Sequence, residues 1–209
     1  MQRRNKLLIA LMIMTVFAGR TQATVDNVST WSGLSNSITA GNSATLTGDI
    51  ASDVTSTITN SNSVATAISV DFATHVINAN SSTGAILNNG TLTLKSGTLE
   101  NFKSSTGVSA LKNTKNLTID SQIVDNNNVI TPTDDAQGGG IYNGSSATLT
   151  VQNSSTISNN TATSIASGKV ASGGGIYNEG TTNITGSTVN SNIADAGGGI
   201  YNVGTTTLS

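Results

Sequence analysis

Side chains that could perform acid–base or metal chemistry are few in this chain. It holds 11 acidic residues, one histidine and no cysteine. Hydrolysis of a polysaccharide needs two carboxylates that face each other, whereas elimination needs a basic residue, usually beside a cluster of metal-binding acids. Asp134 and Asp135 are adjacent in sequence. Their side chains should therefore diverge into solvent rather than form such a pair.

The remaining ionisable residues show no catalytic spacing. His75, the only histidine, precedes two apolar residues in a strand-like segment, which indicates a structural or exposed role. Other acids are spread over expected turns and do not repeat at the spacing of a calcium-binding aspartate motif. They include Asp71, Asp120, Asp125 and Asp195. We therefore expect no catalytic residue, no metal site and no cofactor.

Tyrosines recur at one place in a repeated motif. Tyr142, Tyr177 and Tyr201 each follow an isoleucine that should point inward, so a strand would turn the tyrosines outward at stacked positions. Such a row is a candidate aromatic contact surface for a carbohydrate or a protein, because aromatic rings offer much area at low entropic cost. The alternative is that the rings stack on one another and stabilise the fold.

The motif is the hexapeptide GGGIYN, which occurs at 138–143, 173–178 and 197–202. Weaker copies lie at 84–88 and 109–113. The fixed points are an apolar residue and, two positions later, an asparagine: Ile86 and Asn88, Leu111 and Asn113, Ile141 and Asn143, Ile176 and Asn178, Ile200 and Asn202. We expect one inward apolar column and an asparagine ladder at the adjoining turn, held by hydrogen bonds.

The spacing of these copies predicts a solenoid. The asparagines are 25, 30, 35 and 24 residues apart, and repeats of this length bury their apolar faces by stacking. Two further apolar registers follow in each repeat, the first with the alternation of a half-buried strand. The first comprises Leu92, Leu94, Leu117, Ile119, Leu149, Val151, Ile184 and Leu208, and the second Leu99, Val124, Ile157 and Val189. Each repeat is thus expected to contain three short strands separated by turns, which is one coil of a parallel β-helix.

The repeats resemble a known class of surface proteins. Each repeat begins with glycines and an aliphatic residue, continues with a short strand, and ends with Ile157 or Val189 followed three residues later by an asparagine. This pattern is similar to the repeats of chlamydial polymorphic membrane proteins and other bacterial autotransporter passengers. The chlamydial pattern has phenylalanine where this chain has Ile157 and Val189. The resemblance is firm over 138–202 and reaches back to about residue 84. It implies a surface-displayed β-helix that an outer-membrane barrel translocates.

The first residues have the pattern of an export signal. A basic start is followed by an apolar run over 7–17 and by small residues that end at Ala23. We therefore expect residues 1–23 to be a signal peptide, too short to span a bilayer. Without it the chain keeps five lysines, no arginine and eleven acidic residues, a formal net charge of −6. A nucleic-acid partner is therefore not expected.

Residues 24–80 should form an N-terminal cap and the first coils. Trp31, Leu34 and Ile38 are spaced to make one apolar stripe on a short helix. Such a helix would cover the open end of a solenoid. Residues 81–209 should be β-helix repeats, and because 207–209 fall inside an expected strand, we expect a chain truncated at its C-terminus.

Two long polar interruptions, 126–137 and 161–172, fall at the same turn of consecutive repeats. We expect two loops that lie side by side, a common position for binding surfaces. Their candidate contact residues are Pro132, Asp134, Asp135 and Lys169.

The sequence therefore predicts an all-β fold: a single-stranded, right-handed parallel β-helix of the pectate-lyase type with a short N-terminal cap. The expected function is that of a non-enzymatic adhesin or scaffold on the surface of a Gram-negative bacterium, or outside it. Expected partners are a host-cell receptor or glycan and the translocator barrel. Because the same fold also carries pectin-degrading enzymes, a polysaccharide-degrading enzyme is the alternative.

Overall fold

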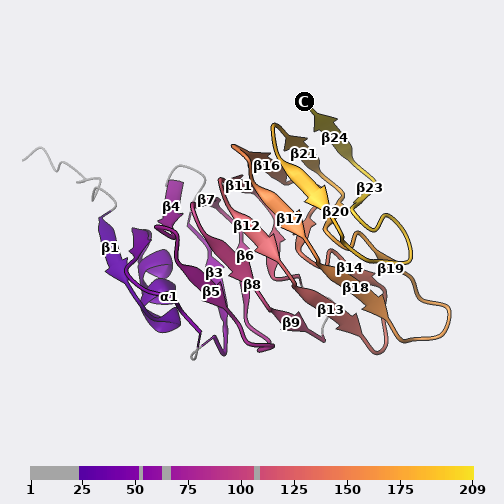
Figure 1. Cartoon of the computed structure of the whole chain (residues 1–209), viewed down its shortest axis with the longest axis horizontal. Helices are drawn as coiled ribbons and strands as arrows, with labels where there is room; N and C mark the ends of the chain where they lie inside the picture. Colours follow the sequence, from indigo (N-terminus) through magenta and orange to yellow (C-terminus); the bar gives the residue numbers. More distant parts are fainter. Residues whose placement is uncertain (1–23, 52–53, 63–66, 106–108) are drawn as a thin grey trace, which may run out of the picture.

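The structure, a computed structural model, describes residues 24–51, 54–62, 67–105 and 109–209. The expected signal peptide lies outside these ranges. Within them, every pair of neighbouring strands is parallel, and the strands of successive coils collect into three long sheets. Figure 1 shows the coils following one another along the long axis, from the N-terminal helix to the C-terminal strands. The fold is a parallel β-helix with a single helix in the described chain, as the sequence predicted.

The N-terminal cap is the helix α1 (Trp31–Ala40), which lies between β1 (Val25–Val28) and β2 (Ser43–Leu46). Thr30 caps the helix start, because its hydroxyl accepts a hydrogen bond from the Gly33 amide at 3.0 Å. A Cβ atom at Gly33 would lie 2.9 Å from that hydroxyl, which explains a glycine inside the helix. The expected stripe of Trp31, Leu34 and Ile38 is buried in the core, so the helix seals the first coil.

Strand β1 was not expected from the sequence. It pairs with β2 in parallel and begins the first long sheet. In spatial order this sheet contains β1, β2, β4 (Ala67–Asp71), β7 (Thr91–Lys95), β11 (Asn116–Asp120), β16 (Thr148–Gln152), β21 (Thr181–Ile184) and β24 (Thr205–Leu208).

The second and third sheets complete each coil. The second contains β3 (Thr57–Asn60), β6 (Ala85–Asn88), β10 (Leu111–Asn113), β15 (Ile141–Asn143), β20 (Ile176–Asn178) and β23 (Ile200–Asn202). The third contains β5 (Val76–Asn78), β8 (Thr98–Glu100), β12 (Ile123–Asp125), β17 (Thr156–Ser158) and β22 (Thr188–Asn190).

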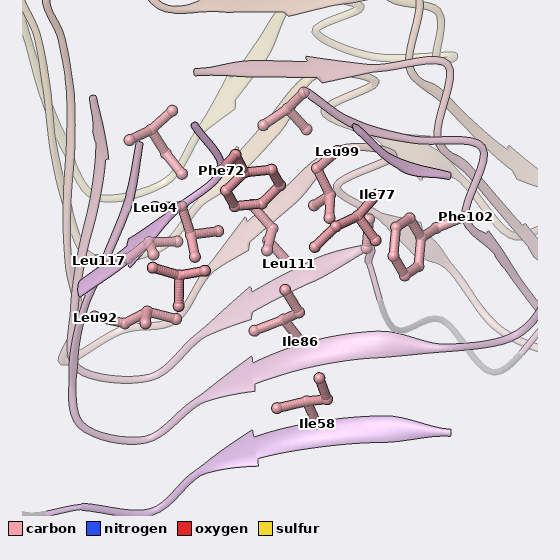
Figure 2. Close-up of a cluster of buried hydrophobic side chains, with 14 of the residues drawn as sticks. Ile58, Phe72, Ile77, Ile86, Leu92, Leu94, Leu99, Phe102, Leu111 and Leu117 are labelled. Atoms are coloured by element: carbon pink, nitrogen blue, oxygen red, sulfur yellow. The ribbon is translucent and has the colours of Figure 1, made fainter. Parts of the chain in front are cut away.

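One apolar core runs through the coils, because each sheet turns alternate side chains inward. Figure 2 shows Ile58, Ile86 and Leu111 on three successive strands of the second sheet, facing the leucines of the other sheets. All members of the expected inward column lie in register and are buried, except the half-buried Ile200 in the last coil. Burying each such aliphatic side chain contributes about 1.5–3 kcal/mol.

The two polar interruptions are not plain loops, which corrects the sequence interpretation. The first contains β13 (Asn128–Thr131) and β14 (Ala136–Gln137), and the second contains β18 (Thr161–Ser164) and β19 (Ala171–Ser172). The strands pair in parallel, β13 with β18 and β14 with β19, and β13 also pairs with the two-residue strand β9 (Lys103–Ser104).

This part of the chain has a small core of its own. Val129 and Ala136 from the first segment pack with Ala162 and Ala171 from the second, and all four are buried. We call residues 126–137 and 161–172 together the side module. Figure 1 shows its strands to one side of the later coils. Its apolar residues are small and few, so the segments look polar in sequence although they are partly ordered as strands.

Candidate functional site

Buried side-chain amides form a continuous row along the second sheet. Each amide nitrogen donates to the side-chain oxygen of the next member over 2.7–2.8 Å. The row consists of Asn60, Asn88, Asn113, Asn143, Asn178 and Asn202, and we call it the asparagine ladder. All members are buried except the terminal Asn202. The ladder fixes the turn between the second and first sheets, and its buried members have no exposed face for a ligand.

Sequence reasoning missed Asn60, the first member. The signal is present, because Ile58 and Asn60 have the same spacing as in the other coils. No glycine precedes this copy, so it lacks the first half of the hexapeptide.

A second amide row lies at the opposite turn. Asn127 donates to Asn160 at 2.9 Å, and Asn160 donates to Asn192 at 3.0 Å. The glycines of the hexapeptide lie against this row. A Cβ atom at Gly140 would come within 2.9 Å of the Asn160 side chain, and one at Gly175 within 2.8 Å of the Asn192 side chain. The repeated glycines therefore leave room for buried amides and for the backbone of the next coil.

The three tyrosines stack on one another. The Tyr142 and Tyr177 ring centroids are 5.6 Å apart with an interplanar angle of 6°, and those of Tyr177 and Tyr201 are 5.3 Å apart at 11°. Tyr177 is only 7% exposed. The ring faces within this tyrosine stack therefore cover one another. The stack exposes mainly ring edges to a partner. The rings thus stack on one another, which was the second of the two sequence interpretations.

A cation and a carboxylate flank the stack. Lys112 Nζ lies 5.4 Å from the centroid of the Tyr142 ring, on a strand of the neighbouring coil. The Tyr142 hydroxyl donates to Glu179 Oε2 at 2.7 Å. Burial, followed by this hydrogen bond, raises the pKa of Tyr142. Burial is also the main cause that raises the pKa of Tyr177.

These groups border a surface depression of about 310 Å³. It is lined by Lys112, Thr114, Tyr142, Gly144, Ser145, Ser146 and Glu179. Sequence reasoning singled out only Tyr142 of this set. A larger depression, of about 520 Å³, lies at the C-terminal end of the stack, where Ile184, Val189 and Ile200 line it. Of these two depressions, the smaller is the one in which charged and hydroxyl groups converge.

The side module brings the two expected contact segments together. Asp135 Oδ1 accepts a hydrogen bond from the Val170 amide at 3.0 Å, which ties the turn after Pro132 to the turn that contains Lys169. The Asp134 carbonyl accepts one from the Ser164 hydroxyl at 2.8 Å. The Asp135 carboxylate therefore stabilises the backbone of the next coil by accepting a hydrogen bond from it. In the described chain neither Asp134 nor Asp135 forms an ion pair with Lys169.

The side module also exposes two large apolar side chains. Ile165 is 68% exposed and Val170 is 47% exposed, and both belong to the turn between β18 and β19. Neither residue is among the contact residues expected from the sequence. Contiguous exposed apolar patches mark contact surfaces, and these two side chains are the large exposed apolar groups of the side module.

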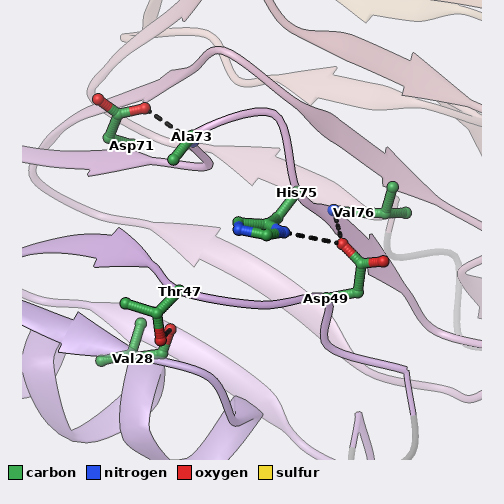
Figure 3. Close-up of polar contacts among 7 residues, drawn as sticks. All are labelled: Val28, Thr47, Asp49, Asp71, Ala73, His75 and Val76. Carbon is green, nitrogen blue, oxygen red and sulfur yellow. Dashed lines mark hydrogen bonds and ion pairs between the residues drawn. The ribbon is translucent and has the colours of Figure 1, made fainter.

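The lone histidine contacts an aspartate near the N-terminal cap. His75 Nδ1 lies 3.1 Å from Asp49 Oδ1, and the same oxygen accepts a hydrogen bond from the Val76 amide at 2.9 Å (Figure 3). The Val76 hydrogen bond, and then that from His75, lower the pKa of Asp49. This contact joins the segment after β2 to the turn before β5, in line with the structural role expected for His75.

Other carboxylates are used in structural contacts. Asp120 accepts hydrogen bonds from Gln152 and Asn153, and Asp125 accepts them from Ser158 and Asn159. Asp71 forms an ion pair with Lys95 at 3.1 Å. Among the described residues there is no group of three or more acids, histidines or cysteines placed to hold a metal ion.

No helix in the described ranges is long and apolar enough to cross a membrane. Comparison with known protein families, with curated proteins and with solved structures found no match to this chain.

Proposed function

We propose that this chain is the passenger of an autotransporter-type surface protein and acts as an adhesin or structural scaffold. In this proposal, the signal peptide over residues 1–23 directs export. An outer-membrane barrel then displays the β-helix on the surface of a Gram-negative bacterium. The partner of the displayed chain is a host-cell receptor or glycan.

The observation that carries the adhesin proposal is the side module. The long sheets repeat nearly the same outward residues from coil to coil, as Thr93, Thr118 and Thr150 do in register on the first sheet. A repetitive face offers little shape for a partner to recognise. The side module departs from the repeat, has its own core, and presents Ile165, Val170 and Lys169 on one projecting turn.

Attachment of the displayed protein to host cells tests this proposal. In a trimmed variant, residues 128–137 and 161–172 are each replaced by residues 193–196, which make the short turn between Asn192 and Gly197. We expect this variant to keep its β-helix, measured by circular dichroism, and to lose attachment. Normal attachment by the folded, trimmed variant would contradict a contact role for the side module.

A matched pair of substitutions tests the same surface without a change of backbone. Ile165→Thr removes an exposed apolar side chain from the side module, and Ile123→Thr removes one that is 42% exposed on the third sheet. We expect the first variant to attach several-fold more weakly and the second to attach normally. Equal effects of the two would show that exposed apolar area in general promotes attachment. No attachment by the intact chain would count against the adhesin itself.

A further inference from the structure

The depression beside the tyrosine stack exists because the turn 144–147 is longer than the matching turns of the two neighbouring coils. Between the second and first sheets, the turns 89–90, 114–115, 179–180 and 203–204 join consecutive strands, whereas residues 144–147 join β15 to β16. The extra length places Ser145 and Ser146 in exposed positions. They form a wall that the two neighbouring coils, with their two-residue turns, lack.

Three successive coils supply the charged and aromatic lining. Lys112 on β10 pairs with Tyr142 on β15, and Tyr142 pairs with Tyr177 on β20, two residues before Glu179. The lysine thus lies over one face of the Tyr142 ring, and the glutamate binds the hydroxyl at the end of that ring. No ion pair joins them within the described ranges, although each contacts that tyrosine. The ammonium group and the carboxylate therefore remain able to bind a ligand.

The lining restricts what a ligand can be. Lys112 donates hydrogen bonds and favours an anion, while Glu179 accepts them and favours a ligand with hydroxyl groups. Ser145, Ser146 and Thr114 add hydroxyls that both donate and accept. An apolar group of a ligand has no aromatic face to pack on here, because Lys112 and Tyr177 cover the two faces of the Tyr142 ring. The volume of about 310 Å³ lies at the lower end of small-molecule sites, which restricts the ligand to a small one.

We propose that this depression binds a sugar unit that carries a carboxylate. The carboxylate pairs with Lys112, the sugar hydroxyls donate to Glu179, and Ser145 and Ser146 complete the polar contacts. This inference rests on the proposed function for its biological setting, a glycan partner of a displayed chain. The binding itself requires no cell and is measured on the purified protein.

Tyrosine signals report directly on the site. The chain contains three tyrosines, and all of them belong to the stack. Glucuronate and glucose are the probes, because they differ in the carboxylate alone. In NMR titrations of tyrosine-labelled protein, we expect glucuronate to shift the Tyr142 signals and to bind about tenfold more tightly than glucose, a difference of about 1.4 kcal/mol. Added salt should reduce this preference.

Two lysine variants make the test specific. Lys112→Gln should abolish the preference for glucuronate, whereas Lys115→Gln removes the same charge from an exposed side chain outside the depression and should preserve it. The chemical shifts of the ligand-free variants check that the stack is intact. Equal affinity for the two sugars, no shift with either, or equal loss in both variants would overturn the assignment. If the purified protein binds the sugars as expected but the displayed protein does not attach to host cells, only the adhesin proposal is refuted.

Discussion

At the scale of single residues, asparagine is the side chain that lets a buried polar row continue from coil to coil. A carboxamide has one acceptor oxygen and two donor hydrogens, so it can accept from one neighbour, donate to the next and still bond a backbone carbonyl. Asn113 does this: it accepts from Asn88 and donates to Asn143 and to the Thr148 carbonyl. An ionised aspartate lacks the donors, and lysine lacks the acceptor. The ladder therefore stabilises the stack and specifies its register.

Removal of an interior member of the ladder should be costly. Asn143→Ala leaves Asn113 without its side-chain acceptor and Asn178 without a donor, both in buried positions. We expect a loss of about 3 kcal/mol in the free energy of unfolding, measured by urea denaturation. The control is Asn202→Ala at the exposed end of the ladder, where water replaces the lost bonds and the loss should be about 1 kcal/mol. Equal losses at the two positions would contradict the role of buried amide pairing.

The tyrosine stack should resist ionisation. The pKa of Tyr142 and that of Tyr177 are raised in the folded chain, so the stability linked to them is present below the ordinary value of 10.0 and is lost as the pH rises above it. Glu179→Gln removes the charge that favours the protonated Tyr142 hydroxyl. We expect part of the alkaline absorbance change to move to lower pH in this variant, while burial keeps it above the ordinary range. An unchanged titration curve would exclude a contribution from Glu179.

At the scale of elements, the glycines determine how closely two coils approach. A Cβ atom at Gly174 would lie 2.4 Å from the Ile193 carbonyl oxygen and 2.5 Å from that of Gly198, both backbone atoms that cannot rotate away. Gly139 meets the Gly174 carbonyl oxygen in the same way, at 2.3 Å. The hexapeptide therefore carries glycine for close packing as well as for the turn.

Alanine at Gly174 should thus separate the coils. We expect Gly174→Ala to destabilise the fold by about 2 kcal/mol or more. At Gly48, a Cβ atom meets nothing within 4 Å, so Gly48→Ala should change the stability by less than about 0.5 kcal/mol. Thermal unfolding of the two variants provides the comparison. Similar melting temperatures would show that the coils adjust to the added methyl group.

Periodic elements were predictable from the sequence, and the irregular ones were not. The strands that carry Ile141, Leu149 and Ile157 repeat their apolar residues, so alternation and spacing gave both the coil and its register. Strands β13 and β18 bury Val129 and Ala162 in a core too small to leave a pattern, and their polar neighbours indicated a loop. The depression depends on Lys112 and Glu179 from different coils, which only the stacked geometry brings to one place.

At the scale of the whole molecule, the β-helix is a one-dimensional stack in which each coil contacts mainly its neighbours. Trp31 is buried under the first coils, while the core thins toward the last coil, where Ile200 is half-buried and Leu208 is exposed. Local stability should therefore fall along the axis. Because the single tryptophan lies near one end and all three tyrosines lie in later coils, two spectroscopic probes report on different parts of the same stack.

Urea titration with both probes should resolve this gradient. We expect the tyrosine near-ultraviolet signal to be lost at a lower urea concentration than the fluorescence change of Trp31, because Tyr201 belongs to the last coil, whose apolar side chains are the least buried. Asn143→Ala should widen the gap, since it weakens the junction within the tyrosine stack and leaves the contacts of α1 unchanged. Coincident transitions in the native chain and in this variant would instead show that all coils unfold as one cooperative unit. In that case the coupling between neighbouring coils would have to exceed the difference in stability between the two ends.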